Sequence, residues 1–119
     1  MNILRNRAVM ENDAVMFDID DTLIFTTGQP NTPLIKLLHD SIELGYKVII
    51  ITARPATQKS LEFTKAQLES YNIPYHRLYL TPAENKGYLK RMTGLNYILS
   101  AGDRNSDLTD TMYALKIVV

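Results

Sequence analysis

The sequence predicts a three-layer α/β fold, in which a mostly parallel, doubly wound sheet of five strands lies between helices. Short apolar runs rich in β-branched residues recur along the chain, helical patterns separate them, and turn-forming residues stand at their ends. Strands that alternate with helices in this way form βαβ units and a parallel sheet. The 119 residues fit one domain, 1–119, with one core. Within it, residues 1–13 are interpreted as a tail, a short helix or an edge element.

Composition narrows the class of protein. Hydrophobic residues make up 45% of the chain, which is typical of a packed globule rather than a disordered segment. The 13 Lys and Arg residues balance the 13 Asp and Glu residues, so no basic field attracts nucleic acid from a distance. The absence of cysteine excludes disulfides and thiolate metal sites. No stretch resembles a signal peptide or membrane span, which predicts a cytoplasmic protein without membrane contact.

The first predicted strand is 14–17, an apolar run of the kind that is buried on both faces of a parallel sheet. It ends in three acids, Asp18, Asp20 and Asp21. Carboxylates in such a place repel one another and cost stability. A chain that keeps them there has a use for them, most simply to hold a divalent cation. The alternative is an acidic β-turn.

Two helices and one strand follow. Thr32 and Pro33 are interpreted as the N-cap and first residue of a helix that ends at Gly45. Residues 47–52 are a β-branched run typical of a central parallel strand, and residues 58–71 are predicted to be the second helix.

The second half of the chain repeats the pattern. Residues 75–80 are the third predicted strand, and residues 81–84 have the spacing of a capping box that opens a lysine-bearing helix. Residues 97–101 are predicted to be the fourth strand, residues 105–115 a helix, and residues 116–119 the last strand.

In a doubly wound sheet, ligands bind beyond the carboxyl ends of the strands. Four segments deliver polar side chains to that edge, namely Asp18 and Asp20, Thr52, Lys86, and Asp103. Mg²⁺ prefers carboxylates and keeps waters that a phosphate can replace, and Asp18 and Asp103 supply such carboxylates. Lys86, Thr52 and backbone amides can neutralise phosphoryl oxygens. One carboxylate can then attack phosphorus, and a second can protonate the leaving oxygen.

These segments resemble the motifs of the haloacid dehalogenase (HAD) superfamily. Residues 15–22 resemble the first motif, and residues 49–52 resemble the second, an apolar strand that ends in Ser or Thr. Residues 98–107, with Gly-Asp and a second Asp four residues on, resemble the fourth. The third motif is a lysine at variable spacing. The resemblance runs from about residue 14 to the end of the chain and implies a Rossmann-like, Mg²⁺-dependent phosphatase.

The resemblance also implies a role for each acid. Asp18 would be the nucleophile and a Mg²⁺ ligand. Asp20 would be the general acid and base, and its backbone carbonyl would bind the metal. Asp103 would complete the metal site, and Asp107 would lie beside it or bind through water. Asp21 is not required by the family pattern and is interpreted as a turn residue.

The remaining site residues bind phosphate or support the acids. Thr52 would bind the transferring phosphoryl group, and Lys86 would neutralise both the nucleophile and the phosphate. Lys90 is the alternative site lysine, and it is otherwise interpreted as part of a solvated helix face. Arg54 and Thr22 are candidates for substrate or supporting contacts, and for Arg54 a solvated or cap-bonding role is an equal alternative.

Most members of the superfamily carry a cap domain after the first motif or between the second and third. Residues 23–31 are too short for one and residues 54–71 form a single helix, so a minimal, capless member is expected. An open site accepts large phosphorylated substrates such as a phosphoprotein or a polynucleotide end. Alternatively, a neighbouring subunit of a homo-oligomer covers it. The Ile-Thr-Ala-Arg-Pro turn resembles that of capless acid phosphatases and of the phosphatase half of polynucleotide kinases.

Two other functions stay open. A receiver-like signalling module also combines aspartate, threonine and lysine on a parallel sheet. Its phosphate-accepting aspartate should end the third strand, where this chain has Leu80-Thr81-Pro82. A catalytically silent HAD scaffold is the other alternative. The intact polar set argues against it, and failure to bind Mg²⁺ would favour it.

Overall fold

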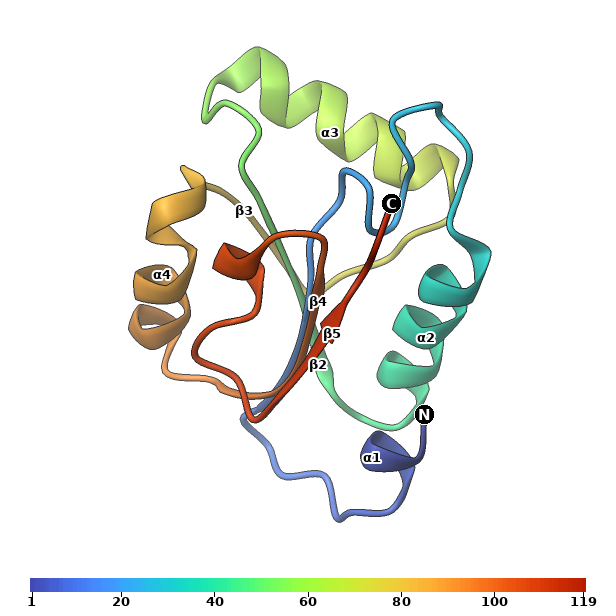
Figure 1. Cartoon of the computed structure of the whole chain (residues 1–119), viewed down its shortest axis with the longest axis vertical. Coiled ribbons are helices and arrows are strands. Elements are labelled where there is room, and N and C mark those ends of the chain that lie inside the picture. Colours follow the sequence, from blue (N-terminus) through green and yellow to red (C-terminus); the bar gives the residue numbers. More distant parts are fainter.

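In the computed structural model, which describes residues 1–119, five parallel strands form one sheet in the order β3-β2-β1-β4-β5 (Figure 1). The strands are β1 (Asp13–Phe17), β2 (Lys47–Thr52), β3 (Arg77–Leu80), β4 (Asn96–Gly102) and β5 (Tyr113–Lys116). The helices are α1 (Asn2–Arg5), α2 (Thr32–Glu43), α3 (Gln58–Ser70) and α4 (Lys86–Thr93), with short 3-10 turns η1 (Ala83–Asn85) and η2 (Asn105–Asp107). The predicted doubly wound, five-stranded parallel sheet is confirmed.

The sheet separates two apolar clusters, because neighbouring side chains of a strand point to opposite faces. On one face α2 and α3 pack on the sheet, with Leu38 and Leu68 fully buried. On the other face Leu89 of α4 packs against the smaller cluster, which contains Met16 and Ile49. Figure 1 shows α2 and α4 on opposite sides of the sheet. All of β1 is buried between these layers.

The direction in which strands are added reverses at β1. From β1 the chain adds β2 and then β3 on one side, and it then crosses back so that β4 pairs with the other edge of β1. Such a reversal leaves a crevice outside the carboxyl ends of the two flanking strands, where doubly wound sheets bind ligands. Asp18 follows β1 and Asp103 follows β4, so the two acids flank this crevice.

Several predicted boundaries are correct, and two caps differ. The bounds of β2 are as predicted, and Thr57 caps α3 by accepting a hydrogen bond from the Ser60 N–H. Helix α2 begins at Thr32 rather than after it, and its N-cap is Asn31. The Asn31 amide donates to the Thr22 carbonyl at 2.9 Å instead of capping the helix.

The capping box predicted at residues 81–84 does not form. Pro82 precedes the 3-10 turn η1 without a side-chain cap, and α4 begins only at Lys86. Lys86 therefore lies in the first turn of α4, where the helix meets the edge of the sheet.

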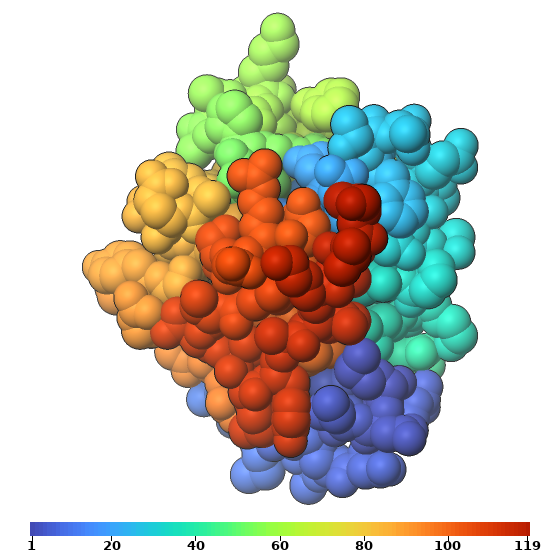
Figure 2. All heavy atoms as spheres, viewed as in Figure 1, coloured from blue at the N-terminus to red at the C-terminus, as the bar shows by residue number.

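The helix predicted at residues 105–115 and the strand predicted at 116–119 are both wrong. Only η2 is helical, and β5 pairs with β4 through the register Leu99 with Tyr113. Two features oppose a helix here. The carbonyls of residues 107 and 109 accept hydrogen bonds from a lysine of α4, which directs them toward α4 rather than along a helix axis, and Asp110 has a left-handed φ of 53°. In Figure 2 this C-terminal segment, in orange-red and red, lies in front between α4 and α2.

Of residues 1–13, residues 1–12 form the short helix α1 and a loop attached to the sheet, and Asp13 begins β1. Leu4 is buried, and its carbonyl accepts a hydrogen bond of 2.8 Å from the Tyr46 hydroxyl. Arg7 forms an ion pair of 2.8 Å with the buried Asp13 at the start of β1. None of the helices has the length and apolar character needed to span a membrane.

Candidate active site

The chain turns sharply as it leaves β1, and this turn exposes the acids at the sheet edge. The Asp18 N–H donates to the Ala101 carbonyl at 3.0 Å, which fixes the end of β1 against β4. The Ile19 carbonyl then accepts hydrogen bonds from three successive N–H groups, those of residues 22–24. Asp21 has a φ of 58°, and its carboxylate accepts two hydrogen bonds from Thr26. Asp21 is therefore a turn residue, as interpreted from the sequence.

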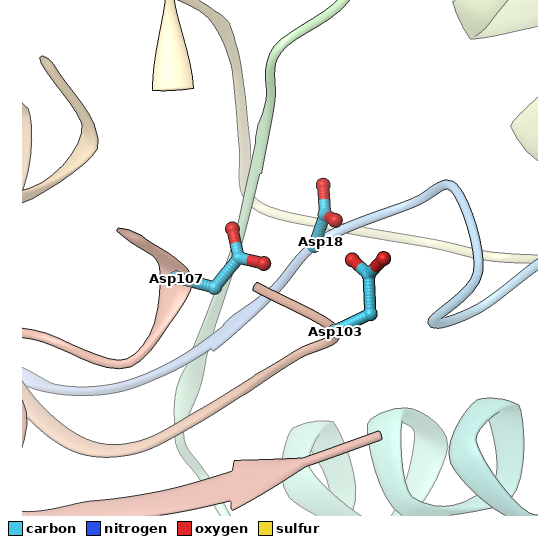
Figure 3. A group of neighbouring side chains, drawn as sticks. All are labelled: Asp18, Asp103 and Asp107. Atoms are coloured by element: carbon cyan, nitrogen blue, oxygen red, sulfur yellow. The ribbon is translucent and has the colours of Figure 1, made fainter. Parts of the chain in front are cut away.

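Three carboxylates meet beyond the carboxyl ends of β1 and β4. Asp18, Asp103 and Asp107 each offer an oxygen, and these oxygens all lie within 4.8 Å of one another. Figure 3 shows the three side chains reaching toward a common space from separate parts of the chain. Asp18 is 6% exposed and Asp107 is fully buried. The predicted meeting of residues 18 and 103, far apart in sequence, is present in the structure.

The cluster suits Mg²⁺ in ligand type and in size. Mg²⁺ takes oxygen ligands at about 2.0–2.1 Å, so oxygens on opposite sides of the ion stand roughly 4.2 Å apart. Oxygens within 4.8 Å of one another require only a small contraction to reach that spacing.

Lys86 enters the same cluster from the first turn of α4. Its ammonium lies 3.1 Å from Asp18 Oδ1 and 2.5 Å from Asp107 Oδ1, and its side chain is 2% exposed. Three carboxylates and one ammonium leave a net charge of −2 when all are ionised, and a divalent cation balances that charge. A buried charge that stays unpaired is costly, so this balance favours binding of a cation.

Burial also governs the ionisation of Asp18. Desolvation by burial raises the pKa of Asp18 to about 7, while the Lys86 ammonium acts to lower it and the Asp107 carboxylate adds to the rise. A cation beside Asp18 favours the ionised carboxylate, which is the form that can act as a nucleophile.

Both carboxylate oxygens of Asp107 accept hydrogen bonds from neighbouring groups. Its Oδ1 contacts Lys86, and its Oδ2 accepts a hydrogen bond of 3.2 Å from the Arg104 N–H. Gly102 makes room for it, because a Cβ built at residue 102 would lie 2.3 Å from the Asp107 carboxylate. With both oxygens already bonded, Asp107 supports the other two acids more than it offers a free ligand.

Asp20 is oriented by Arg54. The side chain of Asp20 is 58% exposed, and Arg54 donates from Nε and Nη2 to its two oxygens at 3.1 and 2.9 Å. The remaining Arg54 nitrogen donates to Thr64 Oγ1 at 3.1 Å, and the guanidinium carbon lies 5.9 Å from the centre of the Phe63 ring. Of the roles left open for Arg54, the solvated one is excluded, because its side chain is only 13% exposed.

The predicted residues line one cavity of about 330 Å³. Its wall includes all five residues of the predicted polar set, Asp18, Asp20, Thr52, Lys86 and Asp103, and Arg54 and Arg104 stand at its rim. Thr52, at the end of β2, is buried, and its hydroxyl accepts a hydrogen bond of 3.3 Å from the Arg54 N–H. Thr22 does not reach the cavity wall. It is fully buried, and its hydroxyl has no hydrogen-bond partner.

Lys90 points away from the cavity, and it is not part of a solvated face. Its side chain is buried, and its ammonium donates to Ser100 Oγ and to the carbonyls of Asp107 and Thr109 at 2.7–2.9 Å. Burial lowers the pKa of Lys90 to about 8. The geometry therefore separates the two candidate lysines, and only Lys86 faces Asp18.

The fold and the cavity define a doubly wound α/β protein with an acidic cluster at the reversal of its strand order. The chain belongs to the haloacid dehalogenase-like hydrolases, because the model of that family matches residues 15–93. This range contains residues 18, 20, 52 and 86, whereas Asp103 and Asp107 lie beyond it. No curated protein matches the chain.

A solved structure supports the same assignment of the fold. A chain of the structure described as "Structure of Pnkp1/Rnl/Hen1 complex" is similar to this chain with a TM-score of 0.62 and 25% identity. The similarity covers 82% of this chain and 41% of that one, so this chain spans less than half of that protein's length.

Proposed function

We propose that the protein is a Mg²⁺-dependent phosphomonoesterase that forms an aspartyl-phosphate on Asp18. The observation that carries the proposal is the convergence of the Asp18–Lys86–Asp107 cluster with Asp103 at the sheet edge. Family membership supports a hydrolase in general. The specific reaction is our inference from the residues in the cavity.

The first half of the reaction transfers the phosphoryl group to the enzyme. A carboxylate oxygen of Asp18 forms a bond to phosphorus while the bond from phosphorus to the leaving oxygen breaks on the opposite side. Asp20 gives its proton to the leaving oxygen, which departs as an alcohol. Lys86 and the Thr52 hydroxyl hold the phosphoryl oxygens in place during the transfer.

The second half releases phosphate. Asp20, now ionised, takes a proton from a water molecule, and the water oxygen forms a bond to phosphorus as the bond to Asp18 breaks. Asp18, Asp103 and the Asp20 carbonyl would hold Mg²⁺, which would supply charge neutralisation for the phosphoryl oxygens. Arg54 keeps Asp20 pointed at the cavity in both halves, and the exposure of Asp20 leaves it free to exchange protons with water.

The open cavity favours large phosphorylated substrates, such as polynucleotide ends or phosphoproteins. Residues 18–31, between β1 and α2, form only a loop, and the segment between β2 and β3 holds only a turn and α3, so neither carries a module that covers the cavity. The Ile-Thr-Ala-Arg-Pro turn after β2, which resembles that of the phosphatase half of polynucleotide kinases, supports testing polynucleotide ends first.

The receiver-like alternative does not fit the sheet. Receivers of that type have the flavodoxin-like strand order 2-1-3-4-5, whereas this sheet has the order 3-2-1-4-5. Moreover, β3 ends at Leu80 without an acid beyond it in the cavity wall.

Phosphate release from a panel of substrates tests the proposal. The panel contains a generic aryl phosphate, a phosphopeptide, a nucleotide and oligonucleotides with a 3′- or 5′-terminal phosphate, each with Mg²⁺ and with a chelator. We expect release only with Mg²⁺ and only from the protein with Asp18 intact. Equal rates in Asp18→Asn or in the chelator would refute the proposal, and failure to bind Mg²⁺ would favour a catalytically silent scaffold.

A further inference from the structure

Lys90 is a buried lysine for which the proposed reaction has no use. It lies one helical turn after Lys86 on the same face of α4 and is 1% exposed. Its ammonium has three protons and three acceptors, which are Ser100 Oγ at 2.9 Å and the Asp107 and Thr109 carbonyls at 2.7 Å each. A buried ammonium is costly unless every donor is paired, so these three bonds fix where the acceptors lie.

Two of these acceptors belong to the segment that carries the acids. Residues 103–110 leave β4, form only the three-residue turn η2, and have little regular structure of their own. Lys86 binds the carboxylate of Asp107, and Lys90 binds its carbonyl. One face of α4 therefore holds Asp107 at both its side chain and its backbone.

The contact between this segment and α4 is close. A Cβ built at Gly87, between the two lysines, would lie 2.5 Å from Asp110 Oδ2 and 2.8 Å from Thr109 Oγ1. The absence of a side chain at Gly87 thus permits the close approach through which Lys90 reaches its acceptors. The other polar link from α4 to residues 108–110 is the ion pair of Arg91 with Asp110, whose side chains are 60% and 26% exposed. Exposed pairs contribute little, so Lys90 is the main polar attachment of Thr109, while Lys86 and Lys90 together hold Asp107.

We propose that Lys90 is a positioning residue that holds residues 103–110 against α4 and thereby sets the affinity of the acidic cluster for its cation. The inference rests on the proposed function for the identity of the cation and for its effect on activity. The role of Lys90 in placing the segment is argued from its hydrogen bonds and does not depend on the proposed function. Lys90 touches neither the cavity nor the substrate.

Four proteins test this inference: wild type, Lys90→Met, Lys90→Arg and Arg91→Met. Lys90→Met keeps the length of the side chain and removes the ammonium, Lys90→Arg restores charge and donors, and Arg91→Met removes the exposed attachment from the neighbouring position. Mg²⁺ affinity is measured by calorimetry, and amide hydrogen exchange is measured by NMR without metal. The informative amides are those of Arg104, Asp107 and Leu108, which are bonded within the segment.

We expect Lys90→Met to bind Mg²⁺ at least about tenfold more weakly, the scale seen for groups that support metal ligands. The three amides should exchange faster by a larger factor than amides of β1. Lys90→Arg should recover part of both effects, and Arg91→Met should match wild type within about twofold. Equal effects on all amides would indicate a general loss of stability and would overturn the inference.

A folded Lys90→Met protein with wild-type affinity and exchange would also overturn it. If Lys90→Met does not fold, Lys90→Gln, whose shorter amide reaches fewer acceptors, takes its place under the same criteria. Unfolding of both variants would assign Lys90 to overall stability and refute a local role. A wild-type protein that binds Mg²⁺ but hydrolyses nothing would refute only the proposed function, whereas one that binds no Mg²⁺ would refute both.

Discussion

The guanidinium of Arg54 donates two hydrogen bonds to Asp20, one to each carboxylate oxygen, across 34 positions of sequence. Thr64 and Phe63 of α3 hold the guanidinium in turn. This support fixes the direction of an otherwise exposed acid. The role of Arg54, two residues after Thr52, was left open by the sequence pattern, and these hydrogen bonds give it one.

Arg54→Lys is expected to lower kcat by about tenfold or more with a smaller change in KM. Lysine cannot bind both oxygens of Asp20 at once, so the acid loses its fixed orientation. General acid–base catalysis contributes roughly 10²–10⁴-fold, so a misplaced acid costs a large part of the rate. Steady-state kinetics on the best substrate of the panel measures this. Arg77→Lys on β3, at an exposed position outside the cavity, is the control. Wild-type kcat in Arg54→Lys would show that Asp20 needs no such support.

Gly102→Ala is expected to disable the acidic cluster, because the new Cβ would lie 2.3 Å from the Asp107 carboxylate. Overpacking of this kind costs about 1–3 kcal/mol of stability, and here it also displaces Asp107 from Lys86. Thermal unfolding and Mg²⁺ affinity should both fall.

Gly28→Ala provides the contrast. Its φ of 91° makes alanine strained, but nothing lies within 4 Å of the new Cβ. We expect a lower Tm with unchanged Mg²⁺ affinity. If the two variants affect Mg²⁺ affinity alike, the contact between Gly102 and Asp107 does not govern the cluster.

Lys86→Met is expected to lower the free energy of unfolding by about 3 kcal/mol at neutral pH without Mg²⁺, because it leaves the buried carboxylates of Asp18 and Asp107 without their cation. Added Mg²⁺ should restore part of this loss. Urea unfolding with and without Mg²⁺ measures both effects. A variant as stable as wild type under both conditions would contradict the charge balance described here.

The lowered pKa of Asp13 makes the stability of the fold depend on pH in the acidic range. Burial acts to raise the pKa of Asp13, but hydrogen bonds from the Met10 N–H, Asn96 and Arg7 outweigh it, and the pKa lies below its ordinary value of 3.8. A carboxyl whose pKa is lower in the folded state than in the unfolded chain stabilises the fold at pH values above its pKa in the unfolded chain. That stability is lost as the pH falls through the folded value.

Asp13→Asn should therefore be less stable than wild type by about 1–3 kcal/mol at neutral pH, and the difference should shrink below about pH 4. Urea unfolding of both proteins from pH 7 to pH 2 measures the difference. A difference that stays constant over this range would mean that ionisation of Asp13 contributes nothing.

The sequence predicts the regular elements best where local signals agree. The bounds of β2 follow from its β-branched run, and α3 begins at residue 58 as predicted. The meeting of Asp18 with Asp103 follows from the rule that ligands bind beyond the carboxyl ends of parallel strands. In each case the information lies within a few residues or in the topology.

Prediction from the sequence fails where the local structure is decided by a contact with a residue far away along the chain. Residues 105–115 have a helical pattern, but Lys90 binds two of their carbonyls from 17 and 19 positions away. A lysine on an amphipathic helix is usually solvated, so nothing local indicates that Lys90 is buried. The hydrogen bonds of Arg54 to Asp20 and Thr64 are equally non-local. Burial and pairing of charged side chains emerge only from the folded arrangement.

The covalent intermediate on Asp18 is the central claim, and chemical trapping tests it most directly. The protein is mixed with substrate and Mg²⁺, quenched within the first turnovers and reduced with borohydride, and the peptide that contains residues 14–24 is sequenced by mass spectrometry. The account predicts reduction of residue 18 alone, dependent on both substrate and Mg²⁺. Continued hydrolysis without modification of Asp18, or modification of another residue in its place, would contradict it.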